Sequence, residues 1–182
     1  IGTLAAGLAL PANAAPAVSA GVRHVLAVGT DGRVLAWGDD SQGQLGLGRT
    51  LETNTPSAVP GVAGAVTVAS GANHVVALLG NGTLLAWGRN TLGELGDGST
   101  TSRPTPAPVA GLSDVIEIAA GEGHTLALRR DGTVWSWGVN YRGQLGYEGE
   151  FLSPRQVPGL PPMAHVAAGT GHSLAVTVDG AV

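Results

Sequence analysis

The stretch AAGEGHTLALRRDGTVWSWGVNYRGQLG, residues 119–146, decides the fold because its markers recur along the chain. Gly-x-x-His occurs at 21–24, 71–74, 121–124 and 169–172, and an Asp-Gly or Asn-Gly pair follows each histidine. Trp-Gly then occurs three times, and so does Gly-x-Leu-Gly. Markers in a fixed order with a period of about 50 residues indicate a repeat protein. The repeated residues are Gly21, His24, Gly32, Trp37, Gly38, Gly71, His74, Gly82, Trp87, Gly88, Gly121, His124, Gly132, Trp137, Gly138, Gly169, His172 and Gly180.

Each unit is expected to form four short strands. The first is small and β-branched (66–70, 115–119 and 165–168), the second begins at the histidine, and the third ends at Trp-Gly. The Asp-Gly or Asn-Gly pair between the second and third is expected to supply the positive φ angles of a tight hairpin turn. The fourth stretch is rich in proline, which cannot donate to a ladder, so it predicts an outer edge strand or coil.

Four antiparallel strands repeated at this period predict an all-β protein with the architecture of a β-propeller. The units span about 15–64, 65–113, 114–162 and 163–182, so about three and a half blades of a larger ring are expected. The small first strand suits the narrow centre, and the tryptophan strand suits the wider space farther out.

Composition excludes several classes of function. The 182 residues carry a net charge of -4, which argues against a nucleic-acid partner, and there is no cysteine for a disulfide, thiolate metal site or nucleophile. No nucleophile elbow, phosphate-binding loop or zinc-protease motif occurs. The segment 39–48 resembles a calcium loop only faintly, because it lacks the full alternation of acidic residues and the closing Glu. No catalytic, cofactor or metal residues are therefore predicted.

The first 14 residues read as the remnant of a signal peptide, with cleavage near Ala14. This predicts a secreted, periplasmic or cell-envelope protein of a bacterium, with a cytoplasmic location as the alternative. The apolar run is too short to span a membrane and contains Pro11, so no membrane insertion of the mature form is expected.

The stretch 119–146, together with AAGTGHSLAVTVDG at 167–180, resembles the repeat of the regulator of chromosome condensation family, and the resemblance covers about residues 17–182. Propellers of the WD and kelch types fit less well, because they carry Trp-Asp or a leading Gly-Gly pair. The resemblance implies a ring of typically seven blades, so continuation of the chain or self-association is expected to close it. It also implies nucleotide exchange on a small GTPase with chromatin binding, scaffolding, or β-lactamase inhibition as functional precedents.

Residues present in every unit are expected to serve the scaffold, the histidines by hydrogen-bonding backbone at their turns. Binding residues concentrate in loops on a rigid frame, and Tyr and Arg are favoured at interfaces. Non-repeated residues are therefore the candidates for contact with a protein partner, with ordinary loop residues as the alternative. They are Arg89, Trp135, Tyr141, Arg142, Tyr147 and Phe151. The predicted function is a non-catalytic protein-binding scaffold. The alternatives are an exchange-type regulator of a small GTPase, or the propeller module of a larger enzyme or adhesion protein.

Overall fold

The structure is a computed structural model that describes residues 17–149 and 151–182. These residues form fourteen strands and no helix, so no described helix is long and apolar enough to cross a membrane. The predicted signal-peptide remnant, residues 1–14, lies outside the described residues.

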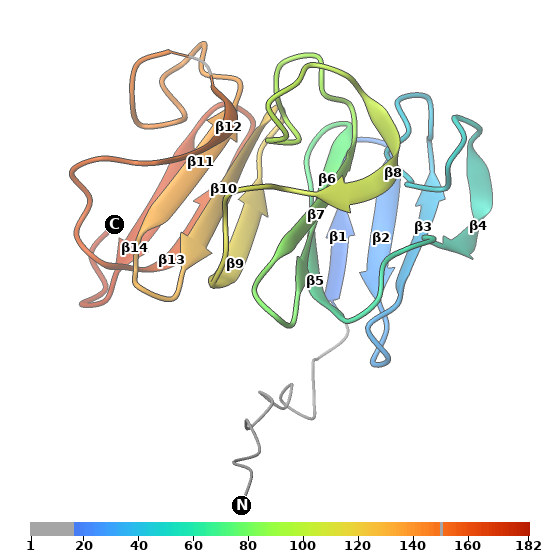
Figure 1. Cartoon of the computed structure of the whole chain (residues 1–182), viewed down its shortest axis with the longest axis horizontal. Coiled ribbons are helices and arrows are strands. Elements are labelled where there is room, and N and C mark those ends of the chain that lie inside the picture. The colour runs from blue at the N-terminus through green and yellow to red at the C-terminus, as the bar shows by residue number, and fades with distance from the viewer. Residues whose placement is uncertain (1–16, 150) are drawn as a thin grey trace, which may run out of the picture.

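The strands form three four-stranded antiparallel sheets and one pair, in chain order within each (Figure 1). The first blade contains β1 (Ala17–Ala20), β2 (His24–Val28), β3 (Val34–Gly38) and β4 (Thr53–Ala58). The second contains β5 (Ala65–Ser70), β6 (His74–Leu79), β7 (Leu84–Gly88) and β8 (Arg103–Pro108). The third contains β9 (Val115–Ala120), β10 (His124–Arg129), β11 (Val134–Gly138) and β12 (Phe151–Gln156), followed by the pair β13 (Met163–Ala168) and β14 (Ser173–Thr177). The prediction of a partial propeller with about three and a half blades is confirmed.

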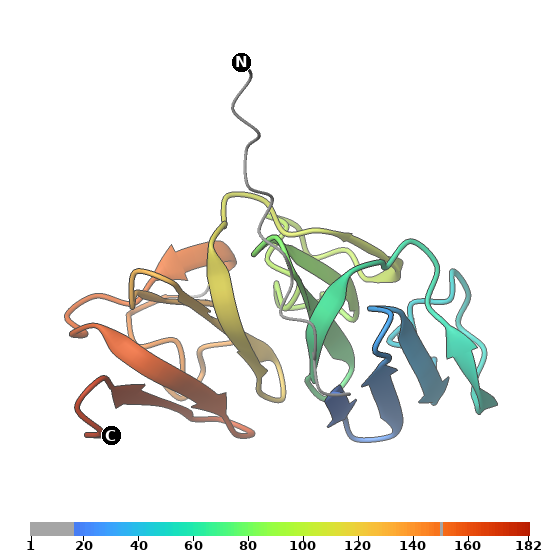
Figure 2. The same ribbon diagram turned by 90° about the horizontal axis from the view of Figure 1, so that it is seen from below.

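Figure 2 shows the sheets fanned along an arc, with β1 to β4 at one end and β13 and β14 at the other. The first strands are innermost, because β1 packs beside β5, β5 beside β9, and β9 beside β13. The small residues at the ends of these strands, Ala20, Ser70, Ala120 and Ala168, leave room for this close approach. The Gly-x-x-His turns meet at one end of the inner strands, around an open hollow of about 470 Å³.

The glycine of each Gly-x-x-His turn is required by close packing. A Cβ at Gly121 would overlap the ring of His124 and the carbonyl of Gly169 in the next blade. The same overlap is found at Gly71, against His74 and the carbonyl of Gly121. The histidine ring therefore lies directly over the glycine three residues before it, and this contact explains the fixed Gly-x-x-His spacing.

The hairpin between the second and third strands differs from the expected two-residue turn. In the third blade, Gly132 donates its N–H to the Arg129 carbonyl (2.9 Å), and only the glycine has a positive φ, +82°. Asp131 instead accepts from the backbone N–H of Thr133 at 3.0 Å. The loop is thus a three-residue turn closed by a left-handed glycine, because aspartate can fix the turn through its side chain without a positive φ.

Tryptophan fixes the contact between successive blades. Trp87 and Trp137 are completely buried against the face of the preceding blade. Their Nε1–H groups donate to the carbonyls of Gln44 and Glu94, each at 3.0 Å. Trp37, at the exposed end of the arc, is only half-buried.

The proline-rich segments form the outer edge strands β4, β8 and β12, as the sequence predicted. Each pairs with the third strand over a few residues, with a break in register before Gly38, Gly88 or Gly138.

Candidate protein-binding face

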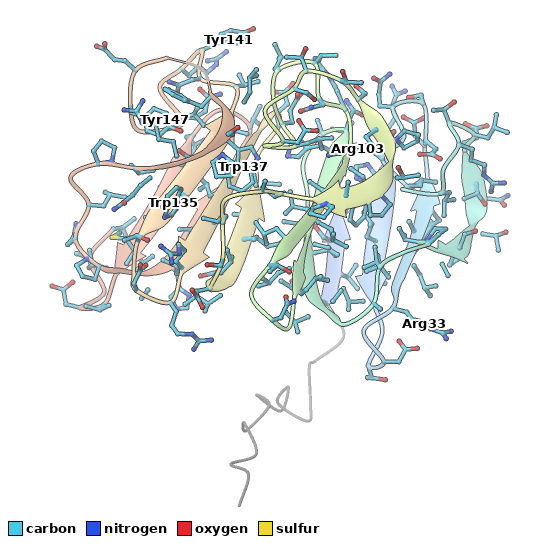
Figure 3. The ribbon with its side chains drawn as sticks, in the orientation of Figure 1. Arg33, Arg103, Trp135, Trp137, Tyr141 and Tyr147 are labelled. Atoms are coloured by element: carbon cyan, nitrogen blue, oxygen red, sulfur yellow. The ribbon has the colours of Figure 1, made fainter. Side chains whose placement is uncertain are left out.

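One end of the propeller carries the Gly-x-x-His turns and the long loops that follow Trp-Gly, and we call it the loop face. It comprises residues 21–23, 39–52, 71–73, 89–102, 121–123, 139–149 and 169–172. The strand hairpins lie at the opposite end, the turn face. Figure 3 shows Tyr141 at the tip of the loop face and Arg33 on the turn face.

The long loops are held by side chains of their own. Asn90 and Asn140 accept from the N–H of Leu95 and Leu145, both at 2.9 Å. In the third blade, Asn140 also donates to the carbonyls of Tyr147 and Gly149, both at 2.6 Å. The loop face is therefore a set of fixed bends on which individual side chains can be presented to a partner.

Tyr147 and Phe151 form a packed cluster with Arg155. Their rings meet edge to face with centroids 5.0 Å apart, and the Arg155 guanidinium lies 4.8 Å and 4.5 Å from the two centroids. Tyr147 donates its hydroxyl to the Ser136 carbonyl at 2.7 Å, and burial raises the pKa of this phenol. Tyr147 thus ties the loop to β11, a role that leaves its ring only partly available.

Tyr141 and Arg142 differ from that cluster because they project from the bend. The Tyr141 side chain is 71 % exposed and Arg142 is also exposed, with its Cδ beside Gly171 of the last turn. The backbone beneath them is fixed, since the N–H of Arg142 donates to the buried Gln144 side chain at 2.9 Å. This pair has the form of an interface anchor, an exposed aromatic and a cation on rigid backbone.

Trp135 and Arg89 lie apart from these residues. Trp135 sits on β11, packs against the core between the second and third blades and donates to Thr133 Oγ1 at 3.1 Å. Arg89 is on the loop face of the second blade, where its Nε lies 3.4 Å from the buried carboxylate of Glu94. The six candidates therefore do not form one surface.

Arg155 was missed by sequence reasoning, although it joins the aromatic cluster. Its counterparts in the earlier units are Ala107 and Ser57, which pair with the third strand at the same position, so the departure from the repeat was the available signal. The prolines around it predict an edge strand, and that pattern does not indicate that Arg155 contacts the aromatic rings.

The repeated histidines link one blade to the next. His74 Nε2 lies 3.0 Å from the hydroxyl of Thr125, and that hydroxyl donates its only proton to the Glu94 carbonyl at 3.2 Å. His74 must then be the donor through Nε2–H. The link replaces the backbone bond expected from the sequence, because the ring points across the interface into the neighbouring blade.

The same link recurs in the third blade and fails in the first. His124 Nε2 lies 3.0 Å from the hydroxyl of Ser173, which donates to the Gln144 carbonyl at 2.7 Å. At the corresponding place beside His24 stands Val75, and both ring nitrogens of His24 are buried without a partner in the described structure. Burial lowers the pKa of His24 and His124 to about 4 and that of His74 to about 3, so all three rings are neutral at pH 7.

Antiparallel four-stranded blades joined by repeated His and Trp contacts define a β-propeller of the repeat class. A family model for the regulator of chromosome condensation (RCC1) repeat matches residues 31–78, 81–128 and 131–176, and a second model of this repeat matches 17–44, 65–94 and 115–144. The chain belongs to the RCC1 repeat family.

Three solved structures illustrate the likeness. A chain in a crystal structure of Kap60 bound to yeast RCC1 (Prp20) is 29% identical with a TM-score of 0.77, and 89% of this chain covers 41% of that one. Prp20p from Saccharomyces cerevisiae, described with its binding to Gsp1p and histones, is 30% identical with a TM-score of 0.75 (88% and 42%). Human WBSCR16 is 27% identical with a TM-score of 0.78 (88% and 44%). The chain therefore spans less than half the length of these relatives.

Proposed function

We propose that this chain is part of a non-catalytic scaffold that binds a protein partner through its loop face, with Tyr141 and Arg142 as anchors. The observation that carries the proposal is the exposure of this non-repeated pair on a bend that is fixed by buried side chains. Such a bend presents the two side chains with little backbone entropy to lose on binding.

The chemistry of the repeated residues supports a binding role over catalysis. The buried histidines of the repeat are neutral and are placed at blade contacts. A structurally similar yeast protein is described with binding to Gsp1p and histones, so protein recognition has a precedent in this repeat. The same similarity supports a second candidate function, which is regulation of a small GTPase. The net charge of -4 favours a protein partner over nucleic acid.

We place the protein outside the bacterial cytoplasm, in the medium or the envelope, on the basis of the apolar run and Ala-Asn-Ala in residues 1–14. Fusion of these residues to a reporter tests the placement. Export of the reporter supports it, and retention in the cytoplasm contradicts it.

The binding role is tested by capture of partners from the producing organism with the wild type and the double variant Tyr141→Ala, Arg142→Ala. We expect the double variant to lose at least tenfold in recovery of the specific partner. The matched control is Arg33→Ala with Arg130→Ala, which removes two exposed arginines from the turn face. Equal recovery with all three proteins would show that the loop-face anchors are not the binding residues. Recovery of a GTPase would favour the second candidate.

A further inference from the structure

The bend after each Trp-Gly is built on one side chain, which is Asp40, Asn90 or Asn140 in successive blades. In each, Oδ1 accepts from the N–H of the leucine five residues later, at 2.8, 2.9 and 2.9 Å. Because the carboxylate and the amide are planar and this oxygen is fixed, the remaining atom of each group occupies the same place.

That place is surrounded by backbone carbonyl oxygens. Asn90 Nδ2 donates to the carbonyls of Ser99 at 3.0 Å and Thr101 at 3.3 Å, and also to Asp97 Oδ1 at 3.1 Å and Ser99 Oγ at 3.2 Å. In the third blade the corresponding amide donates to the carbonyls of residues 147 and 149. The first bend has the same turn pattern as the second, so we expect the carbonyls of residues 47, 49 and 51 at the corresponding positions.

Asp40 places an acceptor where its counterparts place a donor. The residue is completely buried, and its Oδ2 has no hydrogen-bond partner in the described structure. A buried anionic oxygen among carbonyl oxygens is repelled by them and has lost its hydration, which is unfavourable unless a positive group compensates. Arg49 on the same bend is exposed, and no ion pair joins it to Asp40 among the described residues.

A second carboxylate belongs to the same bend. Glu52 stands where the second blade has Ser102, whose hydroxyl accepts from the Asn90 N–H at 3.1 Å. Glu52 is exposed, so it lies at the open edge of the bend, and Asp40 lies inside. Compared with the second bend, the first thus has Asp40 in place of Asn90 and Glu52 in place of Ser102, and it has lost the amide donor.

We propose that the Asp40 bend is a calcium site, with Asp40 Oδ2 and the carbonyl oxygens of the bend as ligands and Glu52 at its open edge. Calcium accepts mixed carboxylate and carbonyl oxygens in flexible geometry, whereas magnesium demands a regular octahedron and zinc prefers nitrogen and sulfur. The sequence predicted no metal here because carbonyl ligands leave no trace in residue types. The site does not depend on the proposed function.

The test is thermal unfolding of the whole chain, freed of metal with EDTA, at pH 7.5 with increasing CaCl₂. We expect the wild-type midpoint to rise by about 3–8 °C at roughly 10 mM calcium, with saturation. Asp40→Asn installs the side chain of the other two blades. It should unfold at a higher temperature than wild type in EDTA and should not respond to calcium.

Asp31→Asn is the matched control, because it removes one negative charge from the turn face. It should keep the wild-type response to calcium. Terbium luminescence, with Tb³⁺ as a calcium probe, should report binding in wild type and Asp31→Asn but not in Asp40→Asn. The absence of a calcium response in the wild type, or an equal response in all three proteins, would overturn the proposal.

Discussion

At the scale of single residues, the three blades differ from one another more in their buried polar contacts than in their apolar core positions. The first, second and third blades share the tryptophan of Trp-Gly and the leucine of Gly-x-Leu-Gly, but they differ in what the histidine and the bend residue contact. The missing partner of His24 shows this, because one β-branched residue, Val75, replaces the threonine or serine found beside His74 and His124. A single hydroxyl therefore completes or breaks the polar contact between two blades.

Val75→Thr is predicted to stabilise the chain by about 1 kcal/mol, because its hydroxyl can accept from His24 and donate to the Gln44 carbonyl. Urea unfolding at pH 7.5 measures the effect. The reverse change, Thr125→Val, leaves His74 without a partner and should cost about 1–3 kcal/mol. Val76→Thr is the control, since it buries a hydroxyl away from the histidine and should destabilise. Destabilisation by Val75→Thr would mean that the link cannot be rebuilt there.

Acid is predicted to unfold the chain through its histidines. The pKa values of His24, His74 and His124 lie below 6.5 in the folded state, so unfolding takes up protons. Their contribution to stability is complete above pH 6.5 and is lost as the pH falls towards 4. Asp40 acts in the opposite direction in metal-free buffer, because burial raises its pKa to about 6.

At pH 5, unfolding is then expected to take up about two protons. The free energy of unfolding should therefore fall by roughly 3 kcal/mol for each pH unit of acidification. Urea unfolding at intervals between pH 7 and 4.5 gives this slope directly. A free energy of unfolding that stays constant over this range would contradict the assignment of neutral buried rings.

At the scale of the strand and turn, the repeat period and the order of the strands were predictable from the sequence, but the turn geometry and the placement of side chains were not. Alternating apolar residues and the Asp-Gly pair mark the hairpin, yet the pair is compatible with both a two-residue and a three-residue loop. Trp135 and Tyr147 are both non-repeated aromatics, but Trp135 lies in a blade contact and Tyr147 on a loop. Sequence spacing cannot tell them apart because blade contacts join residues far apart in the chain.

Two turns give a prediction at this scale, the β10–β11 hairpin at Gly132 and the connection between β4 and β5 at Gly61. Gly61 and Gly132 both have a positive φ, +76° and +82°, but a Cβ at Gly61 meets open space, whereas one at Gly132 would lie 2.8 Å from Pro162. Gly61→Ala should therefore cost about 1 kcal/mol, from backbone strain alone. Gly132→Ala should cost at least twice as much, because strain and overlap add. Equal losses of unfolding free energy for the two variants in chemical denaturation would show that the segment around Pro162 moves aside without cost.

At the scale of the whole molecule, the part of the chain that the structure describes leaves one face of the first blade uncovered. Val18, Leu35 and Leu51 of the first blade are exposed, and Trp37 is half-buried, whereas Trp87 and Trp137 are covered by a preceding blade. The covered faces show what such a surface packs against, which is another blade of the same repeat. Each unit of a repeat protein depends on its neighbours in this way.

The uncovered face is therefore predicted to make the isolated chain associate with a second copy. Sedimentation velocity across a range of concentrations should show a dimer or larger species at high concentration. Leu35→Asp with Trp37→Arg should shift the chain towards the monomer, because both changes place charge on the apolar face. At low concentration, the double variant should lose less stability than Leu84→Asp does, because Leu84→Asp places a negative charge at a buried position of the second blade. A wild-type chain that stays monomeric at every concentration would exclude association through this face, and the exposed apolar residues would then remain uncovered in the isolated chain.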